Sequence, residues 1–176
     1  APSNPEVHRE LAEIPLRSGK PVFVDKPFAP SKADAEAMFE LAAEHNTPLM
    51  SSSALRFSTE LDAYRNKPGT TYMETTGGGG SFWEYSIHQI EMIVSVLGTG
   101  AARIMQCGAG GVEHMVIEYP DDRRATVTYT AYSPFATRFV HDGKMIINQD
   151  CSNYFPILLS EILDFFATGK SPIDAA

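Results

Sequence analysis

The order of helix and strand signals changes once along the chain, near Arg56, and this change limits the possible folds more than any single motif. Before it, the pattern predicts a helix over Glu6 to Ser18, a strand at Val22 to Val24, a helix from Ser31 to about Asn46, and an extended segment from Pro48. Alternating αβαβ elements of this kind are typical of parallel strands covered by helices.

After Arg56, apolar and polar residues alternate with the period of β-strands, and residues typical of tight turns separate the alternating segments. Residues 112–119 and 124–132 alternate on either side of Pro120-Asp121-Asp122, and Asp142-Gly143 joins residues 138–141 to residues 144–148. Turn residues in these places predict two hairpins and therefore an antiparallel sheet. A last amphipathic helix is predicted over residues 154–168, before Gly169.

One strand of that sheet has two different faces. Ala125, Val127 and Tyr129 point to one side, which we expect to pack on the core. The other side is polar but uncharged, and we expect it to meet solvent or another subunit. It carries Thr126, Thr128, Thr130 and Tyr132.

A helix predicted over residues 83–97, ending before Gly98, carries an acid and a histidine one turn apart. Its apolar positions are Trp83, Ile87, Ile90, Val94 and Leu97, and the neighbouring stripe contains Glu84, His88, Glu91 and Ser95. Glu84 can reach the His88 ring and hold its tautomer, which suits a general base with an orienting acid. The same stripe also fits the solvated face of a packed helix.

A run of four glycines, Gly77 to Gly80, stands directly before that helix. It fits the rim of an active site, and it equally fits a flexible linker. His88 and Glu91 also have the spacing of two metal ligands, but no other ligand group lies at diagnostic spacing, so we expect no metal.

Composition narrows the class of partner. The formal net charge is −8 and no Lys/Arg cluster occurs, which argues against nucleic acid or an anionic membrane surface and favours a small molecule. Cys107 and Cys151 fit no C-x-x-C pattern and are expected to be buried or free thiols, although a disulfide stays open. No stretch has membrane-spanning length and no signal-peptide layout begins the chain, so we expect a cytoplasmic protein.

Two segments of the sequence resemble the signatures of one enzyme family. The first runs Gly19-Lys20-Pro21-Val22-Phe23-Val24-Asp25-Lys26-Pro27, and the second comprises Gly79, Gly80, Glu84, His88 and Glu91. Together they resemble the Gfo/Idh/MocA family, which includes glucose-fructose oxidoreductase and inositol dehydrogenase. Asp25, Glu84 and Glu91 each replace the family's acid by the other acid.

The resemblance implies an α/β fold: a partial Rossmann segment of parallel βα units, followed by an α+β domain with an open, mainly antiparallel sheet. Residues 1–57 would be the C-terminal part of a dinucleotide-binding domain. Residues 58–176 would be the substrate and oligomerisation domain. The open sheet commonly builds dimers or tetramers in the family, and the polar face described above is our candidate for that contact.

The resemblance also implies an NAD(P)-dependent oxidoreductase acting on a sugar, polyol or related hydroxyl compound. Lys26, Glu84 and His88 would be catalytic and would bind the substrate, and Asp25, Lys26 and Pro27 would lie against the NAD or NADP. The peptide before Pro27 is often cis in the family. Without Pro27 and the second motif, Lys26 would be interpreted as a surface lysine at a strand end.

The sequence departs from the family at one important place. It contains no Gly-x-Gly-x-x-Gly turn after a first strand, so we expect the chain to lack the N-terminal part of the Rossmann domain and to bind NAD(P) poorly. Two other functions stay open: an NAD-dependent glycoside hydrolase of the same fold, and a non-catalytic shortened relative that serves binding or oligomerisation. The remaining histidines, His8, His45, His114 and His141, are expected at solvated or sheet positions.

Overall fold

The computed structural model describes residues 4–173 of the 176-residue chain. Its residues form two compact units. The N-terminal unit comprises residues 1–53 together with 155–176, and the sheet unit comprises residues 54–154. Among the described residues, no helix is long and apolar enough to cross a bilayer.

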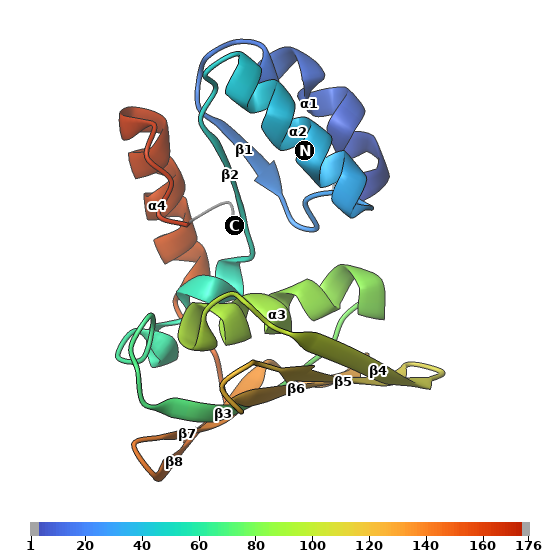
Figure 1. The fold of residues 1–176 in the computed structure, drawn as a ribbon, viewed down its shortest axis with the longest axis vertical. Helices are drawn as coiled ribbons and strands as arrows, with labels where there is room; N and C mark the ends of the chain where they lie inside the picture. Colours follow the sequence, from blue (N-terminus) through green and yellow to red (C-terminus); the bar gives the residue numbers. More distant parts are fainter. Residues whose placement is uncertain (1–3, 174–176) are drawn as a thin grey trace. The chain divides into compact units, whose positions relative to one another are not determined.

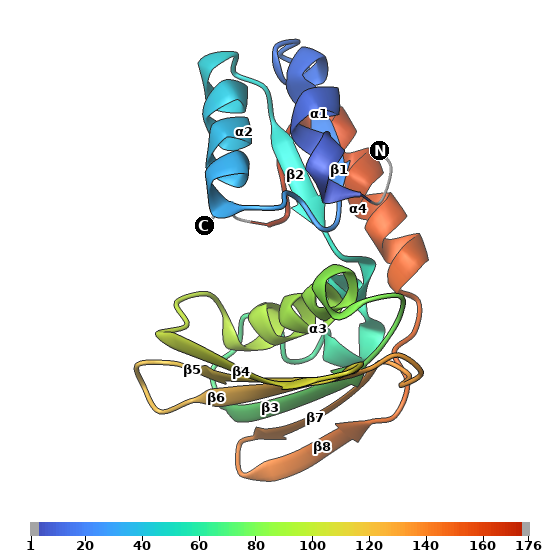
Figure 2. The same ribbon diagram turned by 90° about the vertical axis from the view of Figure 1, so that its right-hand side faces the viewer.

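The N-terminal unit has the predicted αβαβ order. A 3₁₀ turn and α1 precede β1, and α2 leads to β2, which pairs with β1 in parallel so that Asp25 lies opposite Ser52. The bounds are η1 (Pro5–Val7), α1 (His8–Leu16), β1 (Val22–Asp25), α2 (Lys32–Glu44) and β2 (Leu49–Ser52). Figure 1 and Figure 2 show both helices alongside the two strands.

Local chemistry explains where α2 begins and how the unit packs. Ser31 is its N-cap, and the Ser31 side chain accepts a hydrogen bond of 3.1 Å from the Asp34 backbone N–H. The main buried cluster of this unit consists of Ala12, Leu16, Val24, Met38 and Ala42. Met50 and Phe165 of the same unit are also buried.

The last helix, α4 (Tyr154–Thr168), begins and ends where the sequence predicts. Gly169 follows it in a left-handed conformation, with φ of 69°, and donates a hydrogen bond of 2.8 Å to the Phe165 carbonyl. We expected this helix in the second domain, but most of its residues group with the N-terminal unit.

The sheet unit is built on one six-stranded, mainly antiparallel sheet, as predicted. The strand order is β4-β5-β6-β3-β7-β8, in which β3 runs parallel to β6 and every other pair is antiparallel. The bounds are η2 (Ala54–Phe57), η3 (Thr59–Leu61), β3 (Thr70–Gly77), α3 (Phe82–Leu97), β4 (Arg103–Ala109), β5 (Val112–Glu118), β6 (Arg124–Thr130), β7 (Ala136–His141) and β8 (Lys144–Asn148). Strands β3 and β4 were not predicted.

Helix α3 lies across one face of this sheet (Figure 2). The core between them is large and includes the fully buried Met73, Met92, Ile93, Val127 and Phe139. The alternation in β6 is confirmed, because Ala125, Val127 and Tyr129 are buried and the threonines between them are half-buried on the opposite face.

The predicted apolar stripe of α3 is correct only in part, because Leu97 is buried but Trp83 is not. Trp83 is 75% exposed, whereas Phe82 is buried and packs edge-on against Tyr129 with ring centroids 5.7 Å apart. Successive helical residues differ by about 100° in direction, so burying Phe82 turns Trp83 outward. Ser86 and Gln89 follow Phe82 on the buried face; the sequence pattern had placed neither there.

Candidate functional site

Asp25, Lys26 and Pro27 lie at the carboxyl end of β1, the edge at which open α/β sheets bind ligands. All three residues are half-buried. The Lys26-Pro27 peptide is cis, as the resemblance implies. This strand end therefore presents one ammonium and one carboxylate group in adjacent positions.

A buried histidine holds the loop that follows Pro27. His8 is 1% exposed, and its Nδ1 donates a hydrogen bond of 3.1 Å to the Phe28 carbonyl. The Phe28 ring packs against Phe39 of α2 with centroids 5.1 Å apart. We predicted a solvated His8, and this was wrong because α1 begins at His8 and turns its ring inward.

The glycine run of the sheet unit is a packed rim and not a loose linker. A Cβ atom added to Gly77 would lie 2.2 Å from the Phe135 ring, and one added to Gly78 would lie 1.7 Å from the Thr130 carbonyl oxygen. A Cβ atom on Gly79 would lie 2.0 Å from the Tyr85 ring. Only glycine permits this close approach.

Two side-chain hydrogen bonds hold the backbone of the same rim in place. The Gln89 amide donates to the Gly77 carbonyl at 3.3 Å, and the Tyr129 hydroxyl donates to the Gly79 carbonyl at 2.9 Å. Burial, together with the nearby negative charge of Glu113 and further contributions from Tyr85 and Glu84, raises the pKa of Tyr129. The hydroxyl therefore stays a proton donor to the rim.

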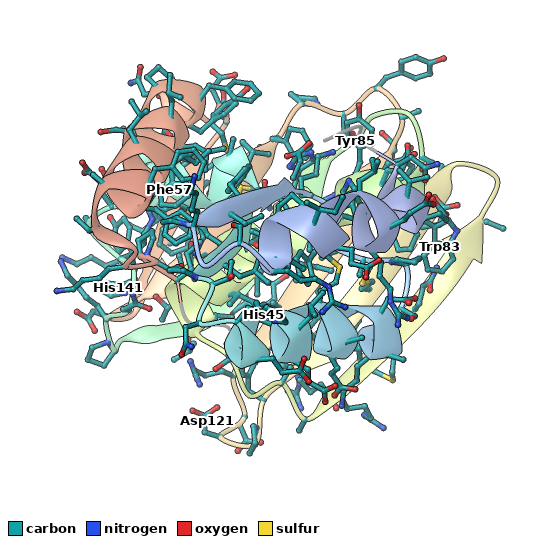
Figure 3. All side chains as sticks on the ribbon, turned by 90° about the horizontal axis from the view of Figure 1, so that it is seen from above. His45, Phe57, Trp83, Tyr85, Asp121 and His141 are labelled. Atoms are coloured by element: carbon teal, nitrogen blue, oxygen red, sulfur yellow. The ribbon has the colours of Figure 1, made fainter. Side chains whose placement is uncertain are left out.

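His88 is half-buried on α3, one turn inside this rim. Its ring lies between two aromatic side chains, with centroids 5.5 Å from Tyr85 and 5.3 Å from Phe135. Both neighbours also contact the rim glycines. Figure 3 shows Tyr85 and Trp83 toward one end of the sheet unit and His141 toward the other.

Glu84 takes part in the N-terminal cap of α3. Ser81 is the N-cap of α3, and its hydroxyl donates to Glu84 Oε2 at 3.2 Å while the Glu84 backbone N–H donates to the same hydroxyl at 3.4 Å. The Ser81 hydroxyl thus caps the helix and at the same time holds the Glu84 carboxylate against the first turn. The carboxylate is exposed and lies in the first turn of the helix that carries His88.

Glu91, the last residue of the second signature, forms an ion pair. Its Oε2 lies 2.7 Å from Arg56 Nη1, and only 17% and 16% of the two side chains are exposed. Arg56 belongs to η2, so the pair ties that turn to α3. Among residues 4–173, no group of three or more His, Cys, Asp or Glu side chains could hold a metal ion.

The predicted site residues are thus divided between the two units. Lys26 lies in the N-terminal unit, with Asp25 and Pro27, and Glu84 and His88 lie one turn apart in the sheet unit. Sequence reasoning missed three residues near them: His8, Tyr129 and Glu113. None of the three belongs to the two segments that resemble the family.

Comparison with known proteins confirms the resemblance. Residues 1–53 match the model of the GFO_IDH_MocA family, described as an oxidoreductase family with an NAD-binding Rossmann fold. An uncharacterised oxidoreductase of Schizosaccharomyces pombe is 27% identical over 119 residues, which are 54% of this chain and 32% of that protein. The chain thus matches about a third of this curated relative's length.

Solved structures share the fold at low sequence identity. An Agrobacterium radiobacter oxidoreductase, crystallised with NAD+, L-tartaric acid and magnesium, has a TM-score of 0.77 and 14% identity over 96% of this chain and 69% of that one. UDP-N-acetylglucosamine 3-dehydrogenase from Acidithiobacillus ferrooxidans gives 0.78 and 12%, over 95% and 68%. A Sinorhizobium meliloti protein described as a myo-inositol dehydrogenase gives 0.72 and 14%, over 83% and 55%.

Proposed function

We propose that this chain is the part of an NAD(P)-dependent oxidoreductase that carries its chemistry, acting on a hydroxyl or carbonyl group of a sugar, a polyol or a related compound. The observation that carries the proposal is the match of residues 1–53 to an NAD-binding Rossmann family, with Lys26 at the carboxyl end of β1. The dehydrogenases of similar fold described above support the substrate class.

In the proposed reaction, His88 is the general base that accepts the proton of the substrate hydroxyl during oxidation. Its half-buried position between two aromatic rings limits the rotation of the imidazole. Glu84 orients the ring from the first turn of α3. Lys26 donates a hydrogen bond to the substrate oxygen and stabilises the negative charge that develops there.

When bound, NAD(P) supplies the hydride acceptor for oxidation, or the donor in the reverse direction. Asp25, Lys26 and Pro27 would lie against it, because parallel strands bind such ligands at their carboxyl ends. The sequence offers strand ends for this contact but no Gly-x-Gly-x-x-Gly turn for the pyrophosphate. We therefore expect the nicotinamide portion to be held better than the rest of the molecule.

Saturation-transfer NMR of NAD+ with the 176-residue chain tests this directly. We expect transfer to the nicotinamide protons to exceed transfer to the adenine protons, and Lys26→Ala to abolish the difference. Lys32→Ala is the matched control, because Lys32 is an exposed lysine of the same unit that forms an ion pair with Glu36, one turn further along α2. Equal signals in all three proteins would refute cofactor contact at β1.

Turnover tests the role of His88. Because a general base contributes roughly 10²–10⁴-fold, His88→Ala should lower kcat by about 100-fold or more in any preparation that reduces NAD+, with a smaller effect on cofactor affinity. His114→Ala, on the opposite face of the sheet, should retain activity. Unchanged turnover in His88→Ala would assign the base to another residue.

We further propose that the open face of the sheet joins copies of the chain into a dimer or tetramer. The face opposite α3 carries three threonines along β6, after Arg124 at the start of the strand, and Tyr132, just beyond that strand, is 98% exposed. Light scattering of the chain measures the mass. A monomer at concentrations well above micromolar would refute the contact through Thr126, Thr128 and Thr130.

A further inference from the structure

The glycine rim adjoins a carboxylate whose hydrogen bonding is incomplete. Among residues 4–173, two buried side-chain oxygens have no hydrogen-bond partner, Gln89 Oε1 and Glu113 Oε2. Gln89 is already engaged through its amide nitrogen, which donates to the rim. A buried carboxylate oxygen without a hydrogen-bond donor costs more free energy of desolvation than a buried amide oxygen does. Glu113 Oε2 is therefore the oxygen that requires an explanation.

The register of the sheet places Glu113 beside the candidate site. In the β5–β6 ladder Glu113 lies directly opposite Tyr129, on the face that α3 covers. Met115 and Ile117, which alternate with the same phase along β5, are buried on that face. Glu113 therefore belongs to the inner side of the sheet, near its end, rather than to the open face.

The hydroxyl of the cross-strand neighbour donates its proton to another group. Tyr129 has one hydroxyl proton, and that proton goes to the Gly79 carbonyl at 2.9 Å. Gly79 in turn contacts Tyr85, whose ring lies against His88. Glu113 and His88 are therefore linked through two intervening side chains and the rim, and the carboxylate lacks the donor that a neighbouring hydroxyl would supply.

We propose that Glu113 binds hydroxyl groups of the substrate, and that it selects a polyol or sugar with adjacent hydroxyls over a simple alcohol. This inference rests on the proposed function, whose reacting hydroxyl is at His88. A carboxylate is an acceptor with two oxygens, so it takes one hydrogen bond from each of two neighbouring O–H groups. The last torsion of a glutamate side chain is broad, which lets either oxygen turn toward a ligand.

The test measures polyol binding by the 176-residue chain without relying on turnover. Titration of ¹⁵N-labelled protein with myo-inositol, followed through the amides of residues 77–88, gives a dissociation constant. A hydrogen bond to a charged group is worth roughly 10- to 100-fold in affinity. We therefore expect Glu113→Gln to weaken binding by about tenfold and Glu113→Leu by more.

A set of mono-deoxy inositols separates recognition from a structural effect. If Glu113 binds one hydroxyl, the inositol lacking that hydroxyl binds the wild-type chain about tenfold more weakly, and binds Glu113→Leu no more weakly than myo-inositol does. The melting temperature of Glu113→Leu should be unchanged or raised, because the variant removes an unpartnered buried oxygen. A purely structural glutamate would lower it.

Glu118→Gln is the matched control, since Glu118 lies on the same strand but on the opposite face, paired with Arg103 and Arg124. Its affinity for myo-inositol should equal that of the wild type. Wild-type binding that Glu113→Gln and Glu113→Leu leave unchanged would overturn this inference and leave the proposed function intact. No binding of myo-inositol, glucose or glycerol by the wild type would overturn both.

Discussion

Glu60 should make the stability of the sheet unit depend on acid pH. Its two carboxylate oxygens accept hydrogen bonds from the hydroxyls of Ser58 and Ser152, and the Ser152 backbone N–H donates to Oε2 at 3.0 Å. These bonds connect η3 to the segment after β8, across 92 residues of sequence. Partial burial raises the pKa of Glu60, but the bonds outweigh it and lower the pKa from 4.5 to about 2.

The size of the effect follows from linkage between protonation and folding. For a fully shielded group, the lowered pKa of Glu60 would be worth about 3 kcal/mol. Glu60 is only half-buried, so screening by solvent reduces this to roughly 1–2 kcal/mol. Because the folded pKa lies below the unfolded one, the stabilisation is complete above pH 4.5 and is lost as the pH falls toward 2.

Urea unfolding at several pH values measures this difference. Trp83 is the sole tryptophan and lies in the sheet unit, so its fluorescence, with circular dichroism, reports that unit. Glu60→Gln should lower the free energy of unfolding by about 1–2 kcal/mol at pH 7 and by progressively less below pH 4. Glu36→Gln, at an exposed site on α2, is the control. A loss that stays constant from pH 7 to pH 3 would refute the reasoning.

Three further predictions concern other contacts. Gly78→Ala should lower the free energy of unfolding by about 2–4 kcal/mol in urea, because the new Cβ meets a backbone oxygen that cannot move aside; a neutral effect would mean the rim is loose. Burial, with the charges of Glu60 and Asp150, raises the pKa of Cys151 to about 11, so iodoacetamide at pH 8 should alkylate the exposed Cys107 faster by a factor on the order of 100, as peptide mass spectrometry would show; equal rates would contradict this. Glu91→Gln should lower the free energy of unfolding by about 1–3 kcal/mol, because it leaves the largely buried Arg56 guanidinium without its negatively charged partner. Thermal unfolding measures this, and an unchanged melting temperature would show that the pair adds no stability.

The two units have cores of very different size. The main buried cluster of the N-terminal unit has five apolar residues beside a two-stranded sheet, and a pair of strands alone is marginally stable in water. The sheet unit buries aromatic and aliphatic side chains of α3 and of four strands, β3, β5, β6 and β7. Free energy from a ligand bound at β1 would therefore add proportionally more to the N-terminal unit, because binding stabilises the folded state by mass action.

The fold was predictable wherever one face of an element is apolar and its ends carry turn residues. Strand β3 was not predicted because Thr70–Gly77 is largely polar, although it is a central strand. Two of its threonines are buried because their hydroxyls find partners: Thr75 donates to the Thr126 carbonyl at 3.2 Å, and Thr70 shares a bond of 2.9 Å with His141. Both partners are distant in sequence.

Strand β4 was not predicted for a different reason, its position at the edge of the sheet. It is an edge strand with every residue exposed, so no alternation of apolar and polar residues marks it. The face of α3 was misjudged because apolar residues occur on most of its sides. Phe82 and Trp83 are adjacent, and only the fit of one ring against Tyr129 decides which of them is buried.

The candidate site shows the same limit at the level of chemistry. Glu84 and His88 are close because a helix brings residues four apart together, and that spacing is visible in the sequence. Glu113 and Tyr129 are close only because β5 and β6 pair in one register, and a shift of one residue would turn Glu113 to the open face. Its importance also depends on an absence, since Tyr129 gives its proton to Gly79 rather than to the carboxylate. A residue defined by non-local pairing and by the hydrogen bond it lacks leaves no motif, so only the folded chain can reveal it.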